Sequence, residues 1–191
     1  GHPPLLLFAV LTAFVFTACE KQLTEDGLVN ESLNTEGSEL KSAHSERGNL
    51  LNFAAHLTGA QEVPSNDSKA TGQAVFKLNK AGDELSYRLI VAHLENVLMS
   101  HIHVAPAGEN GPVVAWLYPS APPPALIPGF SNGILQTGVI TADDLVGDLS
   151  GEDLSELVDL MKEGNTYVNV HTSQFLPGEI RGQIWANGLM E

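Results

Sequence analysis

A period-two alternation of apolar residues runs through most of the chain from residue 50 onward and constrains the fold more than any other feature. In LNFAAHLTG (51–59), Phe53, Ala55 and Leu57 recur at every second position. Side chains of a strand point alternately to opposite faces, so this pattern indicates a strand with one buried face. Similar segments separated by turns predict eight strands, over residues 51–59, 71–79, 84–94, 97–105, 112–118, 134–141, 166–172 and 178–186. We therefore expect an all-β fold, an antiparallel Greek-key β-sandwich or barrel.

Two segments depart from the alternation. In SGEDLSELVDLMKEGN (150–165), apolar residues recur three and four positions apart, which predicts one short crossover helix near residues 151–163. Ser150 and Asp153 suit a capping pair at its start, and Gly164 suits its end. The stretch PSAPPPALIPGFSNG (119–133) is expected to be irregular, because proline lacks the N–H group that a β-ladder requires.

The N-terminal region differs in composition from the rest of the chain. Residues 4–18, PLLLFAVLTAFVFTA, are almost wholly apolar but shorter than the roughly 20 residues of a membrane-spanning helix. They end at FTAC, which resembles a bacterial lipobox, and they predict a lipoprotein signal peptide over residues 1–18 with lipidation at Cys19. The alternative is a buried core segment with a free thiol. Residues 19–49 are polar and are expected to form a disordered tether, followed by a folded domain over residues 50–187.

Composition excludes some classes of partner. The chain carries 23 acidic and 9 basic residues, a net charge of −14. Nucleic-acid binding requires a basic face, so we expect no nucleic-acid partner. The expected contact with a membrane is through lipid on Cys19, which places the protein in a bacterial cell envelope, periplasmic or at the cell surface. With one cysteine, no disulfide can form within the chain.

Polar side chains share one face of several predicted strands. His101 and His103 lie two residues apart in VLMSHIHVA (97–105), and residues two apart on a strand point to the same side. If the valines and isoleucines between such residues mark the core, the polar groups point away from it and form one outer patch. The expected members of that patch are His56, His101, His103, Asn169, His171, Glu179 and Arg181.

This pattern is typical of a metal site. An H-x-H pair offers two imidazoles from one side, and His171 on another strand can complete a site for copper or zinc. Glu179 is expected as a ligand, or, like Asn169, as the acceptor for a second ring nitrogen; His56, Glu62, Asn169 and Arg181 are possible additional residues. Affinity should fall as the pH drops through about 6.5, the unperturbed histidine pKa. The alternative is a set of exposed histidines, with Glu179 and Arg181 hydrogen-bonded across strands.

Four motifs in this order resemble the CHRD domain, which was named after chordin and occurs in many bacterial secreted proteins. They are LTGAQEVP (57–64), ATGQAVFKLN (70–79), SHIHVAPAGENGPVVAWL (100–117) and GNTYVNVHTSQFLPGEIRGQI (164–184). The resemblance implies an all-β extracellular domain over about 50–186, with no established enzymatic role. Its motif positions here are Glu62, His101, His103, Asn169, His171, Glu179 and Arg181; His56 is not among them.

Three functions follow as expectations. The first is a membrane-tethered, extracytoplasmic CHRD-domain protein that binds a divalent metal ion through the His/Glu patch. The second is an adhesion or protein-interaction module without metal. The third is an oxidoreductase similar to copper/zinc superoxide dismutase, a more distant resemblance resting on HIHVAPAG and VNVHT, although the chain has too few histidines and lacks the disulfide. No G-x-S-x-G or P-loop motif is present, so no catalytic residue is predicted.

Overall fold

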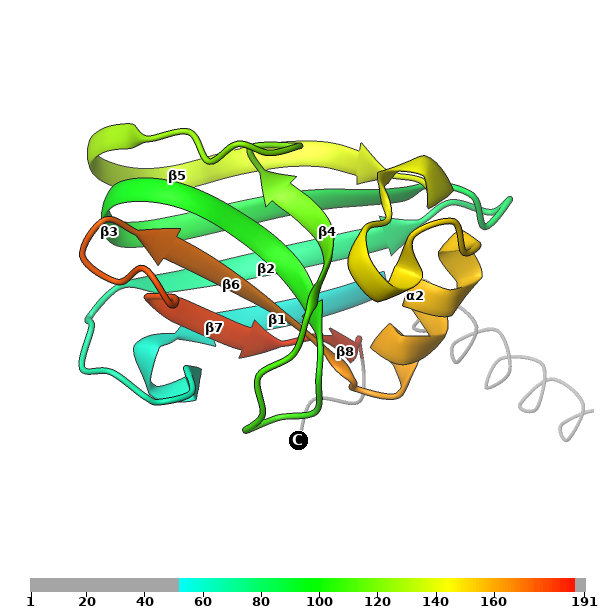
Figure 1. The fold of residues 1–191 in the computed structure, drawn as a ribbon, viewed down its shortest axis with the longest axis horizontal. Coiled ribbons are helices and arrows are strands. Elements are labelled where there is room, and N and C mark those ends of the chain that lie inside the picture. The colour runs from blue at the N-terminus through cyan, green and yellow to red at the C-terminus, as the bar shows by residue number, and fades with distance from the viewer. Residues whose placement is uncertain (1–51, 188–191) are drawn as a thin grey trace, which may run out of the picture.

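The computed structural model describes residues 52–187, and within them the fold is mostly β, with eight strands and one α-helix (Figure 1). The all-β prediction with a single helix is therefore confirmed. The strands are β1 (Asn52–Thr58), β2 (Thr71–Leu78), β3 (Leu85–Val104), β4 (Val113–Tyr118), β5 (Ile127–Ile140), β6 (Thr166–Thr172), β7 (Ile180–Gln183) and β8 (Trp185–Ala186). The helix is α2 (Leu154–Lys162), and three short 3-10 helices are η1 (Gly59–Gln61), η2 (Ala142–Asp144) and η3 (Gly147–Leu149).

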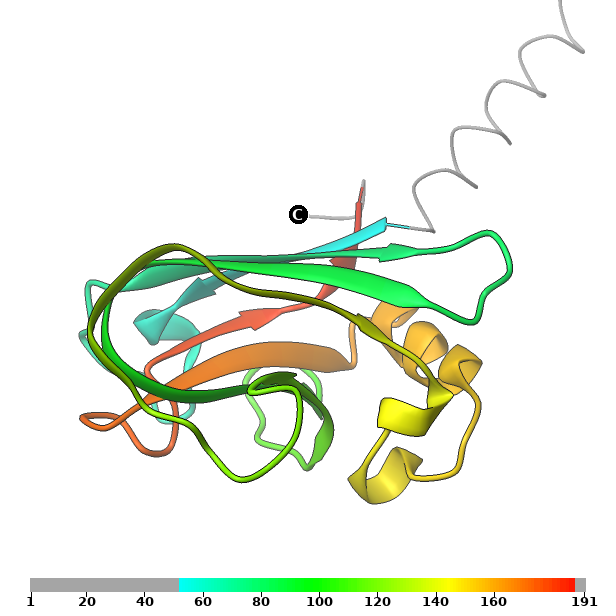
Figure 2. The same cartoon turned by 90° about the horizontal axis from the view of Figure 1, so that it is seen from above.

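The strands form a sheet that closes on itself. Its order is β2-β1-β7-β6-β3-β4, and β2 also pairs with β3, so β3 joins the two ends of the β2-β1-β7-β6 segment. Every pairing is antiparallel. Figure 2 shows the resulting flattened barrel, with α2, η2 and η3 near one end and η1 near the other.

Strand β3 is the longest element and corrects the prediction of separate strands over 84–94 and 97–105. Its first half pairs with β2 and β5, and its second half pairs with β6 and β4. Between the halves, His93 and Asn96 adopt positive φ angles of 61° and 56°. The pairing register with β5 shifts on both sides of this point, and the Asn132 side chain of β5 accepts a hydrogen bond from the His93 N–H.

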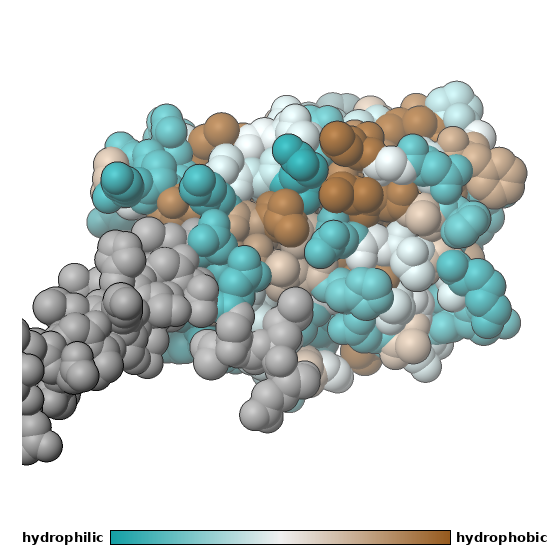
Figure 3. Space-filling model, turned by 180° about the vertical axis from the view of Figure 1, so that it is seen from behind, coloured by the Kyte–Doolittle hydropathy of each residue, from teal (hydrophilic) through white to brown (hydrophobic). Residues whose placement is uncertain are grey.

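Strand β5 corrects the prediction that residues 119–133 are wholly irregular. Pairing with β3 begins at Ile127, opposite Val97, although Pro128 lies inside the strand. The register shifts between Glu95 and Val97 of β3, and an irregularity of this kind accommodates a proline. Three large apolar residues of β5 are exposed, Phe130, Ile134 and Val139. Figure 3 shows apolar residues interspersed with polar ones on the side of the molecule turned away from the view of Figure 1.

Helix α2 packs its apolar stripe into the core. Leu154, Leu157, Val158 and Met161 are buried, as the helical period predicts. The helix ends before Gly164, whose φ of +71° suits a glycine. Asp153 occupies the N-cap position, but no side chain caps the helix there, so the predicted Ser150/Asp153 capping pair is wrong.

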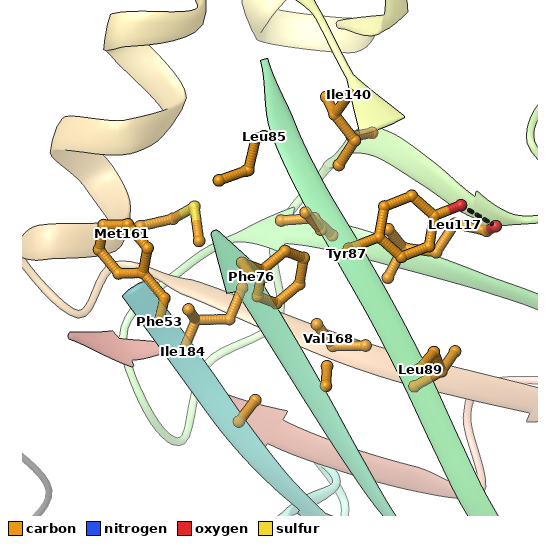
Figure 4. Close-up of a cluster of buried hydrophobic side chains, with 14 of the residues drawn as sticks. Phe53, Phe76, Leu85, Tyr87, Leu89, Leu117, Ile140, Met161, Val168 and Ile184 are labelled. Carbon is orange, nitrogen blue, oxygen red and sulfur yellow. Dashed lines mark hydrogen bonds between the residues drawn. The ribbon is translucent and has the colours of Figure 1, made fainter. Parts of the chain in front are cut away.

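The core occupies the inside of the barrel (Figure 4). Phe53, Phe76 and Val168 point into it from β1, β2 and β6, Ile184 from between β7 and β8, and Met161 reaches it from α2. Full burial of a large apolar side chain contributes about 1.5–3 kcal/mol each. The alternation of apolar residues in the sequence therefore identifies the core-facing sides of the strands correctly. The predicted site residues His101, His103, Asn169, His171 and Arg181 of β3, β6 and β7 lie on the other face.

Candidate metal centre

Three histidines from two adjacent strands come together on the face of the sheet opposite the core. His101 and His103 belong to β3, and His171 belongs to β6. One ring nitrogen from each lies within 4.8 Å of the others. The ring centroids of His101 and His171 are 5.1 Å apart, and those of His101 and His103 are 5.5 Å apart.

The cluster is buried, which corrects the expectation of an exposed outer patch. The exposed fractions are 3% for His101, 8% for His103 and 6% for His171. The segment between β3 and β4 covers one side, where His103 Nδ1 lies 2.9 Å from the Gly111 carbonyl oxygen. The segment after β6 covers another, where His171 Nδ1 lies 2.8 Å from the Leu176 carbonyl oxygen. Alternation identifies the residues that share a face but carries no information about which loops cover it.

His103 and His171 face more hydrogen-bond acceptors than they have protons to donate. Nε2 of each ring lies 3.0 Å from Oδ1 of Asn169, in addition to the backbone carbonyl at Nδ1. Burial lowers the pKa of both rings, against the opposing effect of these hydrogen bonds, so the rings are neutral at pH 7. A neutral imidazole carries one N–H. One nitrogen of each ring therefore presents a lone pair, and donation of Nδ1–H to the backbone carbonyl puts that lone pair on Nε2, beside the Asn169 side chain.

His101 has no hydrogen-bond partner at either ring nitrogen among the described residues. Its ring packs edge-on against Trp116 of β4, with centroids 4.3 Å apart. Burial, and then the neighbouring His171 and His103, lower the pKa of His101 to about 3. A buried polar group without a partner costs about 1–3 kcal/mol. A hydrogen-bonding group or a cation bound to a His101 ring nitrogen would remove part of this cost.

Arg181 and Tyr167 form a stack beside the cluster. The Arg181 guanidinium lies 3.5 Å from the centroid of the Tyr167 ring, and Tyr167 in turn stacks on His103 with centroids 4.7 Å apart and planes 6° apart. Arg181 is 1% exposed and donates hydrogen bonds to Asn110 Oδ1 and the Pro106 carbonyl, both at 3.3 Å. The stack therefore anchors the covering segment over the histidines.

The other predicted site residues lie outside the group of three. Glu179 accepts hydrogen bonds from Ser68 Oγ at 2.7 Å and Thr172 Oγ1 at 2.6 Å and is hydrogen-bonded to none of the three histidines. Asn169, the other predicted acceptor, does lie against Nε2 of both His103 and His171, and backbone carbonyls lie against Nδ1. In the alternative interpretation, Glu179 and Arg181 each make hydrogen bonds across strands: Glu179 does so with Thr172 of β6, and Arg181 instead donates to the segment between β3 and β4. The one ion pair of the described residues joins Lys162 to Asp159. His56 is exposed on β1.

Glu62 and Cys19 complete the set of predicted residues. Glu62 is buried, and its Oε1 has no partner among residues 52–187. Desolvation raises the pKa of Glu62 to about 7, despite the nearby Arg181 cation and a hydrogen bond from Val63. Cys19, the predicted signal peptide and the predicted tether lie outside the described residues.

The alternation in the sequence identifies only some of the groups that surround the histidines. It places Tyr167 on the same face as Asn169 and His171 but does not predict that the Tyr167 ring stacks on His103. Trp116 of β4 pairs with His101 of β3, and the register of these two strands shifts both before His101 and after Ile102. The alternation within a single strand does not predict such shifts. Gly111 and Leu176 contact the histidines through their backbone carbonyl oxygens. Every residue has such an oxygen, so the residue type does not indicate which of them contact a histidine.

Comparison with known proteins agrees with the all-β fold and the motifs. No curated protein and no solved structure matches the chain. None of the helices within residues 52–187 is long and apolar enough to cross a membrane. The family model of the CHRD domain matches residues 53–184, well over half of the chain, and that range contains the whole histidine cluster. The chain therefore belongs to the CHRD domain family.

Proposed function

We propose that this CHRD domain binds one divalent ion of copper or zinc through His101, His103 and His171. The observation that carries the proposal is the buried His101 ring, whose two nitrogens have no partner among the described residues although two further imidazoles lie beside it. A cation bound between the three rings gives His101 a partner and uses the lone pairs of the other two.

The arrangement of the ligands supports this role. Three nitrogens bound at about 2.0–2.1 Å from one ion lie roughly 3.4 Å apart in tetrahedral geometry. The nitrogens here lie within 4.8 Å of one another, so small side-chain rotations bring them to one ion. The carbonyls of Gly111 and Leu176 fix the orientation of two of the rings, which is the usual task of groups around a metal ligand.

The test is a calorimetric titration of zinc and copper(II) into purified, tag-free protein at pH 7.5. We expect one saturable site in the wild type. His103→Gln, which keeps most of the side-chain volume, should weaken binding by at least about tenfold. His56→Ala, at an exposed position on β1, is the matched control and should bind as the wild type does.

A wild type without a saturable site would contradict metal binding and leave the interaction-module alternative. His103→Gln with unchanged affinity would also contradict the proposed ligand set. Circular dichroism of each variant checks that the fold is retained.

We further propose that the mature protein is anchored to a membrane of the bacterial cell envelope through lipid on Cys19. The support is the apolar run ending in FTAC and the polar segment that follows it. Mass spectrometry of the protein from its native host should find Cys19 as the N-terminal residue, carrying acyl chains. A mature protein that retains residues 1–18, or an unmodified Cys19, would contradict the anchor.

A further inference from the structure

We propose that Met99 supplies a fourth, thioether ligand to the histidine centre, and that the centre therefore holds copper(I) in preference to zinc. The inference rests on the three-histidine centre of the proposed function and goes beyond it in two ways: it names a fourth ligand, and it makes the preferred ion monovalent copper rather than a divalent ion. Methionine carries a soft, polarizable sulfur on an unbranched side chain, which adapts its conformation to its surroundings.

The pairing of β3 with β6 places Met99 on the same face of the sheet as His101, His103 and His171. Met99 pairs directly with His171, His101 pairs with Asn169, and the pairing stays regular from Met99 to Val104. Residues directly opposite one another in an antiparallel pair have Cβ atoms about 4.5–5.5 Å apart. The side chain of Met99 therefore starts beside His171, and it shares a face with His101 and His103.

Met99 differs in its surroundings from Met161, the other methionine of the described residues. Met161 is fully buried in the apolar core (Figure 4). Met99 is half-buried and lies on the opposite face of the sheet, two residues before His101 and opposite His171 of β6. A thioether needs no hydrogen-bond partner, so it can fill this position with or without an ion.

The chemistry of a thioether selects between the two candidate metals. Zinc in proteins is bound by thiolate, imidazole and carboxylate groups, whereas a thioether is a soft ligand that suits copper(I). Three neutral imidazoles and one neutral thioether provide four donors without any negative charge. Copper(I) carries one positive charge and zinc two, so an uncharged ligand set penalises zinc more on burial.

The positive charge of Arg181, beside the histidine cluster, also favours copper(I) over zinc. The Arg181 guanidinium reaches His103 through the Tyr167 ring and forms no ion pair with any described residue. Glu179, an acidic residue predicted to join the site, is held by the Ser68 and Thr172 hydroxyls. The guanidinium repels a doubly charged ion twice as strongly as a singly charged one at the same distance.

Competition titrations test the inference. Under anaerobic conditions at pH 7.5, copper(I) affinity is measured against bicinchoninate, and zinc affinity is measured against a chromophoric zinc chelator. We expect Met99→Leu to weaken copper(I) binding by at least about tenfold and to leave zinc binding within about twofold of wild type. Met161→Leu removes a thioether from the core and should change neither affinity. Both substitutions conserve volume, so the fold should survive them.

X-ray absorption of the copper(I) protein gives a second readout. A copper–sulfur shell should be present in the wild type and in Met161→Leu and absent in Met99→Leu. Unchanged copper(I) affinity in Met99→Leu, or a wild type without that shell, would overturn the thioether ligand while leaving the three-histidine centre intact. A wild type that binds neither ion would overturn the proposed function itself.

Discussion

The three histidines differ in how their ring nitrogens are held. His103 and His171 are each fixed at Nδ1 by a backbone carbonyl, whereas His101 has only ring contacts with Trp116 and its two histidine neighbours. Their burial also changes the expected effect of pH. Because burial lowers the pKa of all three rings, the folded protein keeps them neutral below pH 6.5, and its metal affinity should persist to lower pH than the sequence suggests.

The stability of the metal-free protein should fall as the pH drops below about 6.5. The unfolded chain protonates its histidines near that pH, whereas the folded His101 resists protonation until its pKa of about 3. The unfolded state therefore binds more protons in this window, and each such histidine lowers the free energy of unfolding by up to about 1.4 kcal/mol per pH unit. Urea unfolding between pH 7.5 and 4.5 measures the slope, and His101→Leu should make it shallower. Equal slopes in the two proteins would show that His101 is protonated in the folded state.

The segment between β3 and β4 covers the histidines and is fixed at several points. Arg181 holds it at Pro106 and Asn110, and the Asn110 side chain donates a hydrogen bond to the Val63 carbonyl at 2.7 Å. The Val104 N–H donates to the Pro112 carbonyl at 3.1 Å, which closes the base of the segment. Gly111 lies so close to Val104 that a Cβ atom there would overlap the Val104 carbonyl.

Gly111→Ala should therefore weaken both the fold and the metal centre. The methyl group must displace the backbone, at a cost of about 1–3 kcal/mol in the free energy of unfolding. Displacement also moves the Gly111 carbonyl away from His103 Nδ1, so metal affinity should fall by about tenfold. Chemical denaturation and calorimetric titration measure the two effects. Glu109→Ala, at an exposed position of the same segment, should change neither, and a Gly111→Ala protein with wild-type affinity would exclude a role for the carbonyl.

At the scale of the whole molecule, the histidine cluster lies across two central strands. Strand β3 pairs with β2, β4, β5 and β6, and β6 also pairs with β7. An ion held by His101, His103 and His171 cross-links β3 to β6, and both strands contribute to the core on their other face. Opening of the centre therefore requires disruption of the barrel.

Metal binding should raise the unfolding temperature of the whole domain in one transition. An ion that binds only the folded state adds about 2.7 kcal/mol at a free concentration of 100 times its Kd. Differential scanning calorimetry with and without zinc or copper measures the shift, and His103→Gln should reduce it strongly. A transition that is unaffected by either ion at saturating concentration would contradict a centre that spans β3 and β6.

The sequence by itself determined which residues share a face. The alternation at Phe53, Ala55 and Leu57 identifies a core face, and the H-x-H spacing places His101 and His103 on one side, because strand period is a local property of the backbone. The helical stripe of α2 was predictable for the same reason. Only the tertiary structure decided that the polar face is buried, because this depends on where distant segments fold. Gly111 and Leu176 reach the histidines from loops, and Trp116 packs against His101 through a strand register that shifts nearby. Arg181 stacks on Tyr167, and Glu179 is held by the Ser68 and Thr172 hydroxyls. These contacts arise from long-range packing, which the period of a single strand does not encode.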